Sequence, residues 1–125
     1  MNLLLDTHVV LWALAEPERL SAEARSAIED GRDAVFVSAA SAWEIGIKRA
    51  LGKLMAPDQL VEALAAAGFQ PLPITVEHAT TAGALPPHHH DPFDRMLVAQ
   101  AMMEGLTVVT RDRSFEPYGV TILKA

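Results

Sequence analysis

Short apolar runs along the chain alternate with segments whose apolar residues recur at helical spacing. Four runs are typical of strands buried on both faces, as the central strands of a parallel sheet are. They cover residues 3–5, 34–37, 106–110 and 120–123. Residues 69–74 fit a short edge strand, because Pro71 and Pro73 cannot donate hydrogen bonds to a neighbouring strand.

Helices are predicted between these strands, with start and stop signals at most of their ends. Ser21 fits an N-cap, Ser41 and Glu44 have the spacing of a capping box, and Asp91 fits an N-cap followed by Pro92 at the first helical position. The predicted helices cover residues 9–15, 22–30, 41–51, 57–67, 75–85 and 92–104. Strands separated by helices indicate one α/β domain over residues 1–125, with a parallel sheet and helices on both faces.

Composition narrows the function classes. The 125 residues suffice for one core, and the absence of cysteine excludes disulfides, thiolate zinc sites and a cysteine nucleophile. No apolar stretch approaches the roughly 20 residues that span a bilayer, and the N-terminus lacks the basic start of a signal peptide. We therefore expect a cytoplasmic protein without membrane contact. The net charge of −6 argues against simple electrostatic binding of nucleic acid, although bound divalent cations would offset it.

Four acidic residues lie at or near places where a strand ends or a helix starts. Asp6 closes the first run, Glu44 follows the second, Asp94 lies at the start of the helix over 92–104, and Asp112 follows the run ending at Thr110. In an open α/β sheet, ligands bind outside the carboxyl ends of the strands. Carboxylates gathered there repel one another unless a cation binds between them, and their hard oxygens suit Mg²⁺ or Mn²⁺. The pattern predicts a metal-dependent active site.

Each acid also has a purely structural explanation. Asp6 and Asp112 could cap turns, Glu44 could only complete the capping box with Ser41, and Asp94 could be a first-turn acid favoured by the helix dipole. Singly, none of them is decisive. The prediction of a metal site rests on the placement of all four acids together.

Other conspicuous residues receive structural interpretations. Three adjacent imidazoles seldom bind one ion, so His88, His89 and His90 are expected in a solvated loop. Trp12 and Trp43 lie on apolar helix faces and are expected in the core.

Four segments together resemble the PIN-domain ribonucleases, and among them the VapC-like toxins of bacterial and archaeal toxin–antitoxin pairs. They are Leu4-Leu5-Asp6-Thr7-His8, Ser38-Ala39-Ala40-Ser41-Ala42-Trp43-Glu44-Ile45, Asp91-Pro92-Phe93-Asp94-Arg95-Met96-Leu97 and Thr110-Arg111-Asp112. The resemblance covers essentially the whole chain. It implies a PIN-like fold, a parallel sheet of about five strands flanked by helices on both faces in three layers, α/β/α.

The resemblance also implies site residues and partners. Mg²⁺ or Mn²⁺ would be held by Asp6, Glu44, Asp94 and Asp112, of which Asp6 and Asp94 are the best candidates for direct ligands. Further candidates for contact with water or substrate are Thr7, Lys48, Arg49, Thr110 and Arg111. The implied activity is endoribonucleolytic cleavage of RNA by a metal-activated water. We further expect a cognate antitoxin as partner and a homodimer.

Three alternatives remain open. A receiver-like Mg²⁺-dependent signalling domain needs an acid pair after the first strand and a later lysine, where this chain has Asp6 alone and Arg111. A phosphatase of the haloacid dehalogenase type needs a second Asp where His8 stands. The third alternative is a catalytically silent PIN scaffold that binds RNA or protein.

Overall fold

A computed structural model describes all 125 residues. Its centre is a five-stranded sheet in the order β3-β2-β1-β4-β5, and every neighbouring pair is parallel. The strands are β1 (Leu3–Leu5), β2 (Val35–Ser38), β3 (Gln70–Leu72), β4 (Thr107–Thr110) and β5 (Ile122–Lys124). The strands β1, β2 and β4 form the middle of the sheet, so their carboxyl ends share one edge.

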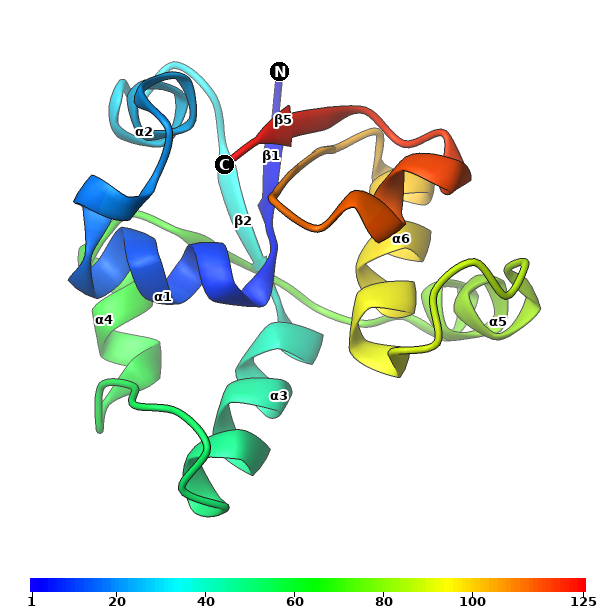
Figure 1. The fold of residues 1–125 in the computed structure, drawn as a ribbon, viewed down its shortest axis with the longest axis horizontal. Coiled ribbons are helices and arrows are strands. Elements are labelled where there is room, and N and C mark those ends of the chain that lie inside the picture. The colour runs from blue at the N-terminus through cyan, green and yellow to red at the C-terminus, as the bar shows by residue number, and fades with distance from the viewer.

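Helices cover both faces of this sheet (Figure 1). The α-helices are α1 (Thr7–Ala15), α2 (Ala22–Glu29), α3 (Ala39–Ala50), α4 (Leu60–Ala66), α5 (Val76–Ala84) and α6 (Pro92–Glu104), and the 3-10 helices are η1 (Pro17–Arg19) and η2 (Arg113–Tyr118). Helices α1 to α4 pack in one core cluster, whereas α6 and η2 pack in another. The predicted parallel sheet of about five strands with helices on both faces is confirmed.

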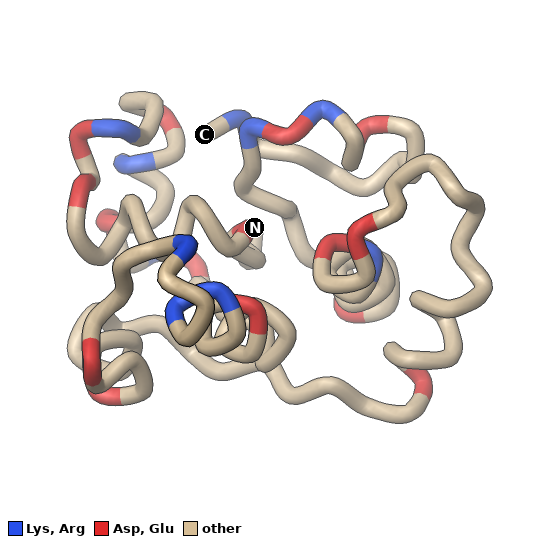
Figure 2. Tube along the Cα trace, turned by 60° about the horizontal axis from the view of Figure 1, so that its bottom comes forward, with Lys and Arg blue, Asp and Glu red and all other residues tan.

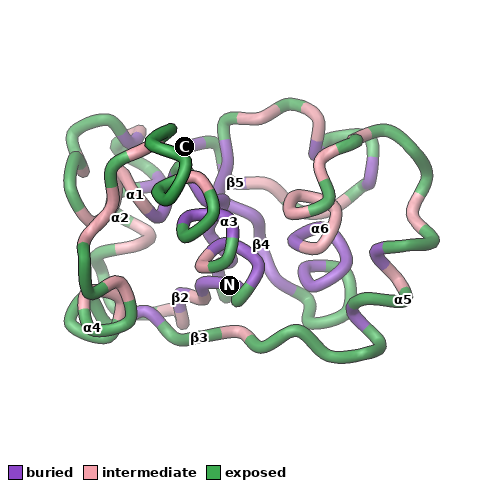
Figure 3. The backbone as a smooth tube through the Cα atoms, turned by 90° about the horizontal axis from the view of Figure 1, so that it is seen from below, coloured by how far each residue is buried: buried purple, intermediate pink, exposed green.

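The two core clusters follow from the alternation of side chains along the strands. Leu3 and Leu5 point into the cluster formed with α1 to α4, and Leu4 points into the cluster formed with α6 and η2. All three are fully buried. Figure 3 shows buried segments through the central strands and α6, and mostly exposed segments on the outer helices. No helix has the length and apolar character needed to cross a membrane.

The start of α3 differs from the prediction. Ser38 ends β2 and is itself the N-cap, because its Oγ accepts a hydrogen bond from the Ala40 N–H. Ser41 lies inside the helix and is buried, so the predicted capping box of Ser41 and Glu44 is wrong. A strand that joins a helix directly leaves no room for a cap three residues later. A capping box does occur in α5, between Thr75 and His78.

The helix predicted to start at Pro57 starts at Leu60 instead. Arg49 pairs with the Asp58 carboxylate and lies 3.5 Å from the Pro57 carbonyl oxygen, which ties this segment to α3 as a loop. The prediction that Trp43 lies in the core is also wrong. Its side chain is 65% exposed and contacts the Phe93 ring edge-on at 5.3 Å between centroids.

Candidate active site

The four predicted acids meet in one pocket at the carboxyl edge of the sheet. Asp6 follows β1, Asp112 follows β4, Glu44 lies on α3 directly after β2, and Asp94 lies in the first turn of α6. The pocket encloses about 420 Å³. Its lining consists of these four acids and His8, Trp12, Lys48, Asp91 and Arg111. The fold thus brings together acids that lie as far apart as residues 6 and 112.

Asp6 is held by the neighbouring strand β4. The Thr110 hydroxyl donates to Asp6 Oδ2 at 2.7 Å, and the Asp6 N–H donates to the Val109 carbonyl at 3.0 Å. Thr110 Oγ1 in turn accepts the Asp112 N–H at 2.9 Å. Burial raises the pKa of Asp6, and the Thr110 hydrogen bond partly offsets this rise. Thr110 therefore links the acids that follow the two central strands.

Glu44 is buried, and both of its carboxylate oxygens are engaged. The Thr7 hydroxyl donates to Oε1 at 2.7 Å, and Lys48 Nζ lies 2.5 Å from Oε2. Ser41 Oγ lies 3.0 Å from Thr7 Oγ1 and completes this group. The hydrogen bond to Glu44 raises the pKa of Lys48, so the ammonium charge compensates the glutamate. Glu44 therefore has less charge to offer a cation than its neighbours have.

Asp94 is placed by the cap of α6. Asp91 Oδ1 accepts hydrogen bonds from the Phe93 N–H at 2.8 Å and the Asp94 N–H at 3.2 Å, and Pro92 occupies the first helical position. The predicted N-cap is confirmed. Asp91 also lines the pocket, so its carboxylate adds to the negative charge there.

The electrostatics of the pocket favour a cation. The pKa of Asp94 rises to about 8, because its carboxyl group is buried and lies near Asp6, Asp91, Glu44 and Asp112. A positive charge among these groups would bring the pKa of Asp94 down and keep it ionised. Hard oxygen donors in this number fit Mg²⁺ or Mn²⁺, so the residues fit the predicted metal.

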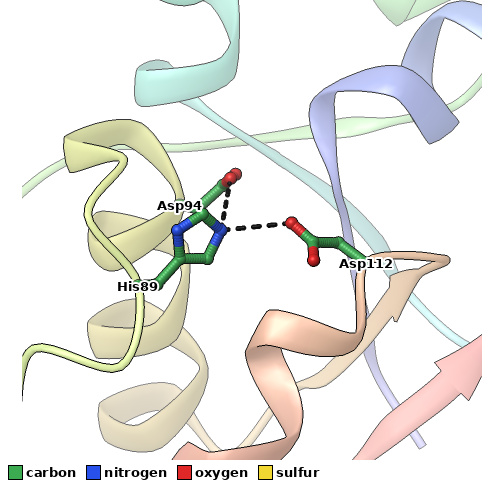
Figure 4. Close-up of side chains that lie close together, drawn as sticks. All are labelled: His89, Asp94 and Asp112. Carbon is green, nitrogen blue, oxygen red and sulfur yellow. Dashed lines mark hydrogen bonds and ion pairs between the residues drawn. The ribbon is translucent and has the colours of Figure 1, made fainter.

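His89 lies next to the pocket and contacts two of its acids, which the sequence analysis missed. Its Nε2 lies 2.9 Å from Asp94 Oδ2 and 3.1 Å from Asp112 Oδ2 (Figure 4). The His89 side chain is only 13% exposed, so the expectation of a solvated loop is wrong for this residue, whereas His88 and His90 are exposed. Burial alone would raise the pKa of Asp112, but hydrogen bonds from Ser114 and His89 lower it.

Comparison with known proteins identifies the family to which this fold belongs. Residues 3–120 match the family profile of the PIN domain. The chain belongs to the PIN-domain family. It is 40% identical over 120 residues to ribonuclease VapC22 of Mycobacterium tuberculosis, a match that covers 90% of this chain and 88% of the relative. A second ribonuclease of that organism, VapC16, is 41% identical over 64 residues, which are 48% of this chain and 44% of the relative.

Solved structures confirm the PIN fold over the full length. VapBC2 from Rickettsia felis, bound to a promoter DNA fragment, superimposes with a TM-score of 0.73 at 14% identity, covering 99% of this chain and 98% of the other. DNA-bound VapBC from Salmonella typhimurium gives a TM-score of 0.69 at 21% identity and the same coverage. Since the family is PIN, the receiver-like and dehalogenase-like alternatives are set aside.

Two arginines of this PIN domain have different surroundings. The Arg111 guanidinium lies 4.4 Å from the centre of the Trp12 ring and donates to the carbonyls of Arg19 and Ala125. Trp12 is half-buried and packs against the core cluster of α1 to α4, as predicted, and together with Arg111 it also lines the pocket. Arg95 donates to backbone carbonyls at the end of α5 and in the segment that joins α5 to α6. They belong to Ala82, Leu85, Pro86 and His89.

Proposed function

We propose that this PIN domain is a Mg²⁺-dependent endoribonuclease that acts as the toxin of a toxin–antitoxin pair. The observation that carries the proposal is the gathering of Asp6, Glu44, Asp94 and Asp112 in one pocket, where the pKa of Asp94 rises to about 8. The 40% identical relative named a ribonuclease supports the reaction class. Mn²⁺ could replace Mg²⁺ at oxygen ligands of this kind.

The four acids would have different roles in phosphodiester cleavage. Asp6 and Asp94 would hold the cation directly, while Glu44 and Asp112 would orient the attacking water or a second ion. A bound Mg²⁺ supplies an activated water and positive charge beside the phosphate. Thr110 fixes the rotamer of Asp6 from β4.

Glu44 and the basic residues have supporting roles. Thr7 fixes Glu44 from the start of α1, so the glutamate keeps one orientation during the reaction. Lys48 and Arg111 line the same pocket and would contact phosphates of the RNA backbone, with Arg49 farther along α3.

A cognate antitoxin is the second part of the proposal. Its basic side chain, an arginine for bidentate pairing, would lie among Asp6, Glu44 and Asp94. An apolar helix of the antitoxin would dock on the helices beside the pocket. Apolar residues are exposed on α3 and at its C-cap, where Trp43 is 65% and Leu51 is 63% exposed. We also propose a homodimer and a cytoplasmic location, where RNA and antitoxin would both be met.

Expression in a bacterial host tests the proposal. The chain alone should arrest growth, the product of the adjacent gene should relieve the arrest, and Asp6→Ala should not arrest growth. Glu62→Gln is the matched control, because Glu62 is an exposed acid on α4 outside the pocket. Purified protein should cleave a fluorescent RNA with Mg²⁺ and not with EDTA.

Two outcomes would contradict parts of the proposal. Continued arrest by Asp6→Ala at equal expression would mean that toxicity does not come from this pocket. RNA binding without Mg²⁺-dependent cleavage would favour the catalytically silent scaffold.

A further inference from the structure

His89 stands between two of the acids that the proposed function assigns to the metal. Its ring comes from the segment before α6, and the three side chains converge from different parts of the chain (Figure 4). We propose that His89 is a positioning residue, whose Nε2–H donates to Asp112 and faces Asp94, and so keeps the two carboxylates side by side as ligands of one cation. The inference rests on the proposed function, because it needs a cation at these acids.

The backbone around His89 is fixed from two sides, which a surface histidine would not require. The His89 N–H donates to the Tyr118 hydroxyl at 2.9 Å, and that hydroxyl donates to the Pro86 carbonyl at 2.7 Å. Arg95 donates to the Pro86 carbonyl at 3.0 Å and to the His89 carbonyl at 3.3 Å. The imidazole packs edge-on against the buried Phe115 ring at 5.8 Å. These contacts hold the segment that carries His89, and its ring faces the acids (Figure 4).

The hydrogen bonds of the ring identify His89 as a donor and not as a metal ligand. Nδ1 accepts the Asp91 N–H at 3.3 Å, so Nδ1 carries no proton. In a neutral imidazole the proton is then on Nε2, which donates to Asp112 Oδ2 at 3.1 Å and lies 2.9 Å from Asp94 Oδ2. A histidine that binds a metal does the reverse, because its other ring nitrogen donates to an acceptor. His89 therefore acts on the cation through Asp94 and Asp112.

The spacing of the acids fits this role. The ligand atoms of His89, Asp94 and Asp112 lie within 4.8 Å of one another. A cation would bind lone pairs of these carboxylates that do not face His89, because the Nε2–H occupies the space between the two Oδ2 atoms. Two carboxylates that close repel each other, and a shared donor opposes that repulsion before a cation arrives. Asp112 is oriented from its other side by the Ser114 N–H, which donates to Oδ1 at 2.8 Å.

Metal binding by purified variants tests the inference. We compare His89→Ala, His89→Gln and the control His90→Ala, whose exposed side chain lies next to His89 in sequence. Mn²⁺ affinity is measured from the electron paramagnetic resonance signal of free Mn²⁺, and Mg²⁺ affinity by competition. His89→Ala should weaken Mn²⁺ binding by about 10- to 100-fold, as loss of a partner to a metal ligand typically does. His89→Gln should recover part of the affinity through its amide N–H, and His90→Ala should bind as the unaltered protein does.

A spectroscopic measurement separates positioning from ligation. Electron spin-echo modulation of bound Mn²⁺ should show no directly coordinated nitrogen in the unaltered protein. A nitrogen coupling that disappears in His89→Ala would overturn the inference and make His89 a ligand. Thermal unfolding in EDTA checks that the variants fold. If His89→Ala does not fold, the Mn²⁺ affinity of His89→Gln is compared with that of the unaltered protein instead.

Failure of the inference and failure of the proposed function look different. Equal or tighter Mn²⁺ binding by His89→Ala, with Mg²⁺-dependent RNA cleavage intact in the unaltered protein, would overturn the role of His89 alone. If the unaltered protein binds no Mn²⁺ and cleaves no RNA, the metal site fails and this inference fails with it.

Discussion

Replacing Asp94 by asparagine separates the charge of this residue from its shape. The amide keeps the size of the side chain and one neutral oxygen, so the α6 cap on Asp91 and the packing of the first turn should persist. The variant lacks the negative charge that holds a divalent ion. We therefore expect Asp94→Asn to fold and to lose Mg²⁺-dependent RNA cleavage.

The raised pKa of Asp94 gives this substitution a second, measurable consequence. Between pH 3.8 and about 8 the unfolded chain ionises Asp94 while the folded protein retains its proton, so the free energy of unfolding falls as pH rises through this interval. The difference of about 4 pKa units sets a ceiling of about 6 kcal/mol, at about 1.36 kcal/mol per unit. Because the Asp94 side chain is 14% exposed, solvent screening lowers the expected effect to roughly 2–3 kcal/mol. Asparagine does not titrate and avoids this loss.

Urea denaturation followed by circular dichroism measures the effect. In EDTA at pH 8, Asp94→Asn should be more stable than the unaltered protein by roughly 2–3 kcal/mol, and the two should converge at pH 4. With Mg²⁺ at pH 8, only the unaltered protein should gain stability, because ligand binding favours the folded state. The reasoning is refuted if the stability difference is the same at both pH values. Full cleavage by the variant at saturating Mg²⁺ would remove Asp94 from the essential ligands.

Three further substitutions test the supporting contacts. Asp91→Ala should lower the free energy of unfolding in urea by about 1 kcal/mol, because Asp91 is the N-cap of α6, and RNA cleavage should still depend on Mg²⁺. Loss of Mg²⁺ binding at unchanged stability would instead place Asp91 among the ligands. Thr7→Val leaves Glu44 Oε1 without its donor, so the free energy of unfolding should fall by about 1–3 kcal/mol and RNA cleavage in a fluorescence assay should be slower. An unchanged cleavage rate would contradict the role of Thr7. Arg95→Lys should lower the melting temperature in calorimetry and weaken Mg²⁺ binding, because lysine cannot donate to the same set of carbonyls around His89. Unaltered Mg²⁺ affinity would disprove the predicted effect on metal binding.

The strands and the acids could be predicted because their signals are local. A short apolar run that ends in Asp6 or shortly before Asp112 marks a strand end directly, and parallel strands place their carboxyl ends together. Glu44 was predicted as a site residue, but the capping box with Ser41 was wrong. Both Ser38 and Ser41 are good capping residues, and the length of β2, set by pairing with its neighbours, decides that Ser38 is used.

The role of His89 depends on tertiary contacts that no local pattern contains. Tyr118 lies 29 residues after His89 and fixes its backbone, and Arg95 reaches back to the same segment. The prediction that Trp43 lies in the core was wrong for a related reason. Its helical spacing indicates an apolar face, but Trp43 is 65% exposed and its ring contacts the Phe93 ring of α6 edge-on.

The charge balance inside the pocket explains how a chain with a net charge of −6 could act on RNA. Basic and acidic positions are interspersed along the chain (Figure 2), so the proposed binding of RNA would not depend on one large basic face. Within the pocket, Lys48 already compensates Glu44. The charges of Asp6 and Asp94 have no comparable lysine or arginine, and the pKa of both residues is raised. A divalent cation would therefore bind where compensation is missing, and its charge would draw the phosphate to the acids that otherwise repel it.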